Sequence, residues 1–344
     1  MTNYLLPYHG EEDLSTYSFL VTGGAGFIGS NLVEYLLKYN AGKVRVLDNF
    51  STGFRHNIES FTAHSAFELI KGDIRDFSTC HEAVKGIDFV FHEAALGSVP
   101  RSINDPLTTN AVNISGFLNM LQASVRNKVK RVVYAASSST YGDSPALPKY
   151  EDIIGKPLSP YAVTKYVNEL YASVYARIYN LDTIGLRYFN VFGKRQAPNG
   201  AYAAVIPKFV KQLLDRESPV INGDGTHSRD FTYIDNVVQM NIKAMFTQNR
   251  QALNQVYNTA YGEQTSLNEL ISYLIEYLKE ADPYITPISI KYGPSRIGDV
   301  KHSLACITKA EKLLDYKPRY PVKDGLKDAI DWYVNEALKS KMQE

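Results

Sequence analysis

The stretch Ser18-Phe-Leu-Val-Thr-Gly-Gly-Ala-Gly-Phe-Ile-Gly29 decides the fold of this chain. Its first five residues are mostly apolar strand formers, and apolar residues at helical spacing follow the last glycine. A second apolar run, 43–47, ends at Asp48. A strand, a glycine-rich turn, a helix, a second strand and an acid, in this order, predict a βαβ unit whose helix N-terminus can bind a phosphate.

The glycines of the turn predict a dinucleotide site. Gly24, Gly26 and Gly29 fit the pattern Gly-x-Gly-x-x-Gly, and Gly23, Gly26 and Gly29 fit Gly-x-x-Gly-x-x-Gly. Glycines here allow the tight turn, let a pyrophosphate approach the backbone and let the helix pack closely on the strand. Asp48 lies where a carboxylate would accept hydrogen bonds from the adenosine ribose and repel a 2′-phosphate. The sequence therefore favours NAD over NADP as the cofactor.

Strand-like and helix-like segments alternate along the rest of the chain. This alternation predicts an α/β fold: a Rossmann-type doubly wound parallel sheet with a smaller α/β substrate-binding lobe. We expect an N-terminal extension over 1–17, an NAD-binding domain over 18–189 plus about 232–260, and the smaller lobe over about 190–231 plus 261–344. The expected strands are 67–70, 88–92, 131–136, 182–186, 229–234 and 256–259. The expected helices are 77–84, 105–126, 160–179, 205–217, 266–279 and two within 307–337, with a turn at 221–225.

The composition excludes several classes of protein. Lys plus Arg is 37 and Asp plus Glu is 36, so the basic excess of a general nucleic-acid binder is missing. Two cysteines are too few for a disulfide framework or a Cys-rich metal site, and the seven histidines show no metal-ligand spacing. The sequence shows neither a transmembrane run nor a signal-peptide pattern. We expect a cytoplasmic protein that binds no metal, no nucleic acid and no membrane.

A second group of residues indicates chemistry on a hydroxyl group. Tyr161 and Lys165 are four residues apart and share one face of a predicted helix, and Ser137 follows a predicted strand. A tyrosine phenol titrates near ~10 in water, and a nearby ammonium together with an oxidised nicotinamide would lower its pKa. Among 25 tyrosines this pairing alone carries little weight. The preceding serine and the dinucleotide unit give the pair its meaning.

Several stretches of the sequence occur together in one known family. They are Thr22-Gly23-x-x-Gly26-x-x-Gly29, His92-Glu93-Ala94-Ala95, Asn113, Ser137 to Gly142, Tyr161-x-x-x-Lys165 and Leu186 to Gly193. With them the chain resembles the extended short-chain dehydrogenase/reductase family from about Ser18 to Val334. Within that family it is most similar to nucleotide-sugar 4-epimerases, in particular to UDP-N-acetylglucosamine 4-epimerases of bacterial surface-polysaccharide pathways.

The resemblance implies a role for each matching residue. Tyr161 would be the base, Lys165 would bind the nicotinamide ribose and Ser137 would assist. The implied contacts to a tightly bound NAD are Gly23, Gly26, Phe27, Ile28, Gly29, Asp48, Asn49, Asp73, Ile74, Ala94, Ala95, Asn113, Tyr161, Lys165 and Tyr188. The implied contacts to a UDP-sugar are Gly97, Ser137, Ser138, Ser139, Asn190, Asn222, Arg229, Arg296, Asp299 and Ser303. Among the latter, the two arginines would clamp the diphosphate and Asp299 would accept the uridine ribose hydroxyls.

The implied activity is interconversion of UDP-GlcNAc and UDP-GalNAc, with UDP-Glc and UDP-Gal as further candidate substrates. Gly97 and Ser303 are small where similar galactose-type epimerases carry larger side chains, which would leave room for an N-acetyl group. A nucleotide-sugar dehydratase or decarboxylase on the same fold is an alternative, although 138–140 is Ser-Ser-Thr where those enzymes carry an acid. A catalytically silent NAD-binding regulator is another. The resemblance also implies a homodimer through the helices at 105–126 and 160–179.

Overall fold

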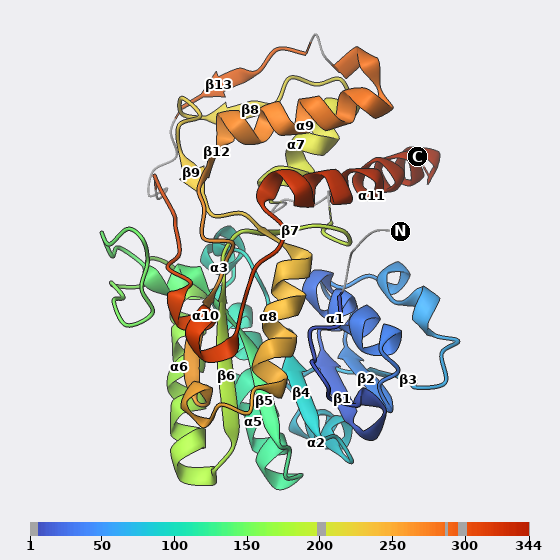
Figure 1. Cartoon of the computed structure of the whole chain (residues 1–344), viewed down its shortest axis with the longest axis vertical. Helices are drawn as coiled ribbons and strands as arrows, with labels where there is room; N and C mark the ends of the chain where they lie inside the picture. The colour runs from blue at the N-terminus through green and yellow to red at the C-terminus, as the bar shows by residue number, and fades with distance from the viewer. Residues whose placement is uncertain (1–5, 198–203, 286–287, 295–300, 344) are drawn as a thin grey trace.

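A parallel seven-stranded sheet forms the centre of the molecule (Figure 1). The computed structural model describes residues 6–197, 204–285, 288–294 and 301–343. The strand order is β3-β2-β1-β4-β5-β6-β11, and the direction of winding reverses between β1 and β4, where doubly wound sheets bind their ligands. The predicted fold class is confirmed. The strands are β1 (Ser18–Thr22), β2 (Lys43–Asp48), β3 (Phe67–Lys71), β4 (Phe89–His92), β5 (Arg131–Ser137), β6 (Asp182–Tyr188) and β11 (Gln255–Thr259).

Helices cover both faces of this sheet. Side chains of β1 alternate between the faces, so Phe19 packs in the core beneath α1 and α8 while Leu20 packs beneath α2, α5 and α6. No described helix is both long enough and apolar enough to cross a membrane. The helices of the larger unit are α1 (Phe27–Lys38), α2 (Phe77–Val84), α3 (Val99–Asn104), α4 (Pro106–Asn110), α5 (Phe117–Arg126), α6 (Pro160–Tyr179), α8 (Ile234–Phe246) and α10 (Thr308–Leu314).

A smaller group of elements lies beyond the carboxyl ends of the strands, at the top of Figure 1. Its helices α7 (Val205–Leu214), α9 (Leu267–Ala281) and α11 (Val322–Gln343) enclose an apolar cluster of their own. The division into two domains stays a prediction. The small sheets are β7 (Val191–Phe192) with β10 (Thr232–Tyr233), β8 (Val220–Asn222) with β13 (Lys291–Gly293), and β9 (Ser228–Arg229) with β12 (Thr265–Ser266).

The structure differs from the sequence-based expectation around these small sheets. The turn expected at 221–225 is wrong in its first two residues, because β8 continues through Asn222 and pairs with β13. The single strand expected at 229–234 is two short strands, β9 and β10, and α8 begins at Ile234. No helix is predicted for 234–246. Every residue from Ile234 to Ile242 is buried, so the helix shows no polar face that could reveal it in the sequence.

The N-terminal segment before β1 packs onto the larger unit. Tyr8 and Leu14 are buried in the core that contains α1 and α8. The backbone N–H of Tyr8 donates to the Tyr35 hydroxyl at 2.7 Å, and the Tyr8 phenol donates to the carboxylate of Asp235 on α8. Residues 6–17 are therefore part of the packed structure, although they lie outside the βαβ unit.

Candidate active site

A cavity of about 420 Å³ opens at the carboxyl ends of the central strands. Its wall is formed by the glycine turn before α1, the ends of β2 to β6 and the first turns of α6. Most of the predicted cofactor residues meet here although they come from six separate stretches of the chain. The predicted residues that line it are Gly23, Gly26, Phe27, Ile28, Gly29, Asp48, Asn49, Asp73, Ile74, Ala94, Ala95, Gly97, Ser137, Tyr161, Lys165 and Tyr188.

The glycine turn has no room for side chains at two positions. A Cβ atom on Gly29 would lie 2.2 Å from the carbonyl oxygen of Gly23, and one on Gly23 would lie 2.8 Å from the backbone nitrogen of Ala94. Gly23 also has a φ of +67°, which favours glycine. Helix α1 begins after Gly26 with no side-chain cap, so its N-terminal N–H groups face the cavity without a capping oxygen. This arrangement fits a pyrophosphate.

Asp48 is anchored at the end of β2. One carboxylate oxygen accepts the N–H of Ala25 at 2.9 Å, and the other accepts the N–H of Phe50 at 2.7 Å. Burial raises the pKa of Asp48, and the two backbone N–H groups oppose that shift. Carboxylate oxygens have further lone pairs, so the side chain can still accept hydroxyl groups of a ribose. The anion also makes this wall unfavourable for a 2′-phosphate.

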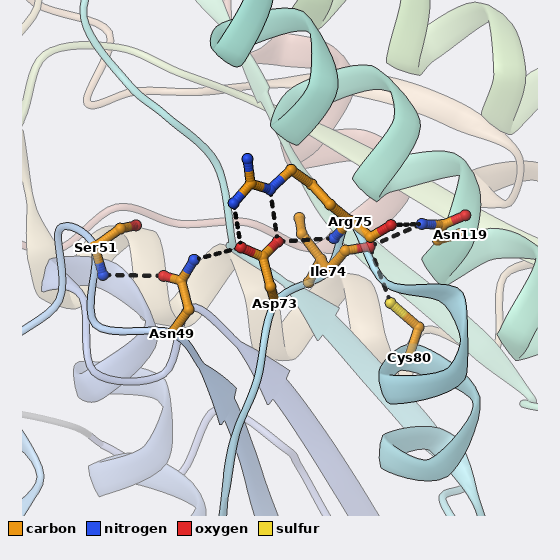
Figure 2. Close-up of polar contacts among 7 residues, drawn as sticks. All are labelled: Asn49, Ser51, Asp73, Ile74, Arg75, Cys80 and Asn119. Carbon is orange, nitrogen blue, oxygen red and sulfur yellow. Dashed lines mark hydrogen bonds and ion pairs between the residues drawn. The ribbon is translucent and has the colours of Figure 1, made fainter.

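Asp73 and Ile74 form a fixed corner of the cavity after β3, next to the end of β2 that carries Asp48 (Figure 2). The Arg75 guanidinium donates to both Asp73 oxygens, at 3.0 and 2.7 Å, and these bonds lower the pKa of Asp73 to about 2. Asn49 donates to the same carboxylate at 2.9 Å. The carbonyl of Ile74 accepts the Asn119 amide at 2.9 Å. The corner is therefore rigid, and the supporting residues Arg75 and Asn119 are not identified by the sequence analysis.

Tyr161, Ser137 and Lys165 meet at the opposite end of the cavity from that corner. Ser159 caps α6 and Pro160 occupies its first turn, which sets Tyr161 at the start of the helix and Lys165 one turn later. Lys165 donates to the carbonyl of Ala135 at 2.8 Å. Burial raises the pKa of Tyr161, and its hydrogen bond with Ser137 opposes that shift. The lowering expected from an oxidised nicotinamide stays a prediction.

Two further contacts position α6. Arg187 on β6 and Glu169 on α6 form a buried bidentate ion pair with distances of 2.9 and 2.8 Å. Asn113 holds the segment after β4 to α6, since it bonds both backbone groups of Leu96 and donates to Thr164 at 3.1 Å. Asn113 lies in a π-helical turn, η4 (Ala111–Gly116), a feature frequent at functional sites. It stands behind the cavity wall and does not line the cavity.

Glu93 is a cavity residue to which the sequence analysis gives no role. It follows β4, lines the cavity and accepts the Tyr188 hydroxyl at 2.9 Å. Burial raises the pKa of Glu93 to about 7, and the Tyr188 hydrogen bond and the charge of Lys165 oppose that shift. Burial lowers the pKa of Lys165 to about 8, and the charge of Glu93 opposes that shift. The feature of the sequence that could have identified Glu93 is its position: an acid that stands directly between a fully buried strand and two alanines.

A second cavity of about 280 Å³ is lined by the segment that follows β6 and by elements of the smaller group, among them β7, α7 and β8. Three predicted substrate residues line it, namely Asn190, Asn222 and Arg229. Tyr188 lines the first cavity and Asn190 lines the second, so a single residue, Phe189, separates the two lining residues in the chain. The Arg229 guanidinium donates to the carbonyl of Lys301 at 3.1 Å. An amide and a cation at one wall suit a diphosphate.

The remaining predicted substrate residues do not line either cavity in the described part of the chain. Ser138 and Ser139 belong to η5 (Ser138–Tyr141), where Ser139 donates to the Ser137 hydroxyl at 2.9 Å. The backbone N–H of Ser303 donates to the carbonyl of Ser228 at 3.1 Å, which places it beside Arg229. Arg296 and Asp299 lie outside the described residues. The described residues contain no group of three His, Cys, Asp or Glu side chains that could hold a metal ion.

Comparison with known proteins gives a consistent family. The profile of the NAD-dependent epimerase/dehydratase family matches residues 19–260. A putative UDP-glucose 4-epimerase of Methanocaldococcus jannaschii is 36% identical over 321 residues, which are 92% of this chain and 98% of the relative.

Two solved structures are similar over nearly the whole chain. One is the UDP-N-acetylglucosamine 4-epimerase of Methanobrevibacter ruminantium M1 in complex with UDP-N-acetylmuramic acid, with 39% identity, a TM-score of 0.85 and coverage of 93% of this chain and 99% of that chain. The other is the UDP-glucuronic acid 4-epimerase of Bacillus cereus in complex with UDP-glucuronic acid and NAD, with 32% identity, a TM-score of 0.84 and the same coverage.

Proposed function

This chain belongs to the NAD-dependent epimerase/dehydratase family of extended short-chain dehydrogenases/reductases, and we propose that it is a UDP-sugar 4-epimerase. Its cofactor is NAD, and the uncapped helix N-terminus, Asp48 and the Asp73 corner fit the two phosphates and the adenosine half. The observation that carries the proposal is the meeting of Tyr161, Lys165 and Ser137 in one cavity with the glycine turn.

The chain's own groups would supply proton transfer and positioning. Held by the glycine turn, Asp48 and the Asp73 corner, NAD would supply acceptance of a hydride from carbon 4 of the sugar and its return to the other face. Tyr161 would remove the proton of the 4-hydroxyl group, and Ser137 would hold that oxygen by a hydrogen bond. Asn190 and Arg229 would hold the diphosphate in the second cavity while the sugar turns. Anchoring the diphosphate uses binding energy to position the reacting atom.

Family membership leaves a dehydratase or a decarboxylase open, and the residues around Ser137 argue against both. The η5 segment carries Ser138, Ser139 and Thr140, with no carboxylate. Of the three acids that line the cavity, Asp48 ends β2 and Asp73 follows β3 at the proposed adenosine end, and Glu93 is bonded to Tyr188. We assign no elimination chemistry to these groups.

We further propose that the preferred sugars carry a 2-acetamido group. Gly97 lines the cavity, and a Cβ atom added there would meet no heavy atom within 4 Å, so space exists at this wall. Ser303 is half-buried beside Arg229 and is small as well. UDP-GlcNAc and UDP-GalNAc are therefore proposed as the better substrates, ahead of UDP-Glc and UDP-Gal.

A homodimer is proposed from exposed apolar side chains on neighbouring helices. Leu107 is 83% exposed on α4, and Ile103 on α3 and Leu170 on α6 are 61% and 50% exposed. Helices α3, α4 and α6 contact one another, so these groups lie on adjacent elements. Sedimentation at micromolar concentration is expected to show a dimer, and the Leu107→Asp/Leu170→Asp variant is expected to be monomeric. A parent chain that sediments as a monomer would rule out this assembly.

Product analysis tests the activity directly. The purified holoenzyme is incubated separately with UDP-GlcNAc, UDP-Glc and UDP-glucuronate, and the products are separated by chromatography. An epimerase gives the 4-epimer with no change in mass, whereas a dehydratase releases water and a decarboxylase releases carbon dioxide. A product of lower mass, or no turnover of any of the sugars, would overturn the proposal.

A further inference from the structure

Glu93 and Lys165 place opposite charges in the cofactor cavity, and of the two only Lys165 has been given a role, as the residue expected to bind the nicotinamide ribose. Both side chains line the cavity, Glu93 from the end of β4 and Lys165 from α6. The Lys165 ammonium donates to the carbonyl of Ala135, a neutral acceptor, and Glu93 in the same cavity is the opposing charge that acts on it. A buried ammonium without an anion would be costly.

The carboxylate of Glu93 is held in place by a chain of two side chains, one from β6 and one from α8. The Tyr188 hydroxyl at the end of β6 donates to it at 2.9 Å, and the amide of Asn241 on α8 donates to the Tyr188 oxygen at 2.9 Å. Gly23 of the glycine turn lies against the backbone of Glu93, so the acid and the pyrophosphate site share one wall. Such support is typical of a side chain whose position matters.

We propose that Glu93 is the counter-ion of Lys165 and that its charge sets how strongly this chain binds the oxidised cofactor relative to the reduced one. An oxidised nicotinamide ring carries a positive charge that the reduced ring lacks. Lys165 repels this charge, and Glu93 attracts it, so the acid offsets the repulsion in the oxidised state alone. A site that favours the oxidised cofactor also favours return of the hydride to the sugar over loss of a half-reacted substrate.

The ionisable groups that surround Glu93 in the described structure allow this charge at neutral pH. Lys165 faces it from α6 and Tyr188 from β6. His92 lies one residue earlier on β4, and burial lowers the pKa of its imidazole to about 3, so the ring is neutral. Glu93 and Lys165 are then the two groups of this cluster that change charge near neutral pH.

The test compares dissociation constants for NAD⁺ and NADH, measured with the cofactor-free chain by calorimetry at neutral pH. Glu93→Gln keeps the shape and removes the charge, and it is expected to weaken NAD⁺ relative to NADH on the order of tenfold, as expected for two charges in one cavity at intermediate dielectric. Glu68→Gln, which removes a carboxylate paired with Arg45 away from the cavity, is the matched control and is expected to leave the ratio unchanged. A folded Glu93→Gln variant whose ratio lies within twofold of the parent would overturn the proposal.

The parent chain offers a second measurement that does not depend on folding of the variant. Its preference for NAD⁺ over NADH is expected to increase as the pH rises through about 7, because Glu93 loses its proton there. A ratio that stays flat across this range would overturn the proposal as well. Both measurements concern cofactor binding without any sugar, so they can fail while the proposed epimerase activity stands, and the reverse is equally possible.

Discussion

The two cavities of this protein are assembled in different ways. The first is built from the ends of parallel strands, where functional residues stand at the last position of a strand, as Asp48 ends β2 and Ser137 ends β5. The second is assembled from short strands and helices that come together across long separations, such as β8 with β13 and β9 with β12. Local sequence order therefore specifies the first cavity, while packing of the smaller group specifies the second.

The largest expected effect tests the chemistry of the first cavity. Tyr161→Phe removes one hydroxyl group and should lower turnover by roughly 10²–10⁴-fold, which is the usual contribution of a positioned proton-transfer group. Steady-state kinetics with UDP-GlcNAc measure this loss. Tyr166→Phe on the same helix, outside the cavity lining, is the control. A Tyr161→Phe enzyme with a tenth of the parental turnover would refute the base assignment.

The next largest effect tests the buried ion pair that joins α6 to β6. Glu169→Ala leaves the Arg187 guanidinium buried without its anion and should reduce the free energy of unfolding by about 3–5 kcal/mol. Urea denaturation of the cofactor-free chain gives this value. The Glu169→Met/Arg187→Met double variant removes both charges and is expected to be less destabilised than the single one. Equal losses in both variants would mean that the buried charge is not the cause.

A smaller effect concerns the adenosine end of the first cavity. The parent is expected to purify with NAD bound. Asp48→Ala removes an anionic acceptor and two backbone contacts, so NAD affinity should fall roughly 10–100-fold. The NAD content of the purified protein and titration of the cofactor-free chain both report it. Asp88→Ala, which lies just before the amino end of β4 and outside the cavity lining, is the control. Unchanged affinity in the Asp48 variant would exclude the ribose-acceptor role.

The smallest expected effect concerns the end of the site that would hold the sugar. Ser303→Tyr should lower kcat/KM for UDP-GlcNAc and UDP-GalNAc by about tenfold and should leave UDP-Glc and UDP-Gal nearly unchanged, because overfilling a pocket penalises the larger ligand. Kinetics on all four sugars with parent and variant decide the matter. An equal fall for every sugar would show that Ser303 does not select the substrate.

Much of the first cavity could be predicted from the sequence, because the patterns that indicate it involve residues close together in the chain. The βαβ pattern around Gly23, the length of α6 and the four-residue spacing of Tyr161 and Lys165 depend on residues close in the chain. Gly23 marks the turn in the sequence, because a side chain at this position would collide with the backbone of Ala94. The sequence by itself determined the fold class and the cofactor NAD, and it supplied the candidate base.

Only the tertiary structure decided which distant groups face one another. Helix α8 is buried on nearly all sides, so its residues carry no amphipathic pattern, and yet it supplies the Asn241 that supports Tyr188. Glu93 and Lys165 lie 72 positions apart in the chain, yet they line one cavity, and the charge of each shifts the pKa of the other against the effect of burial. A pKa depends on the burial of a group and on the charges near it in space, and both are set only when the chain has folded.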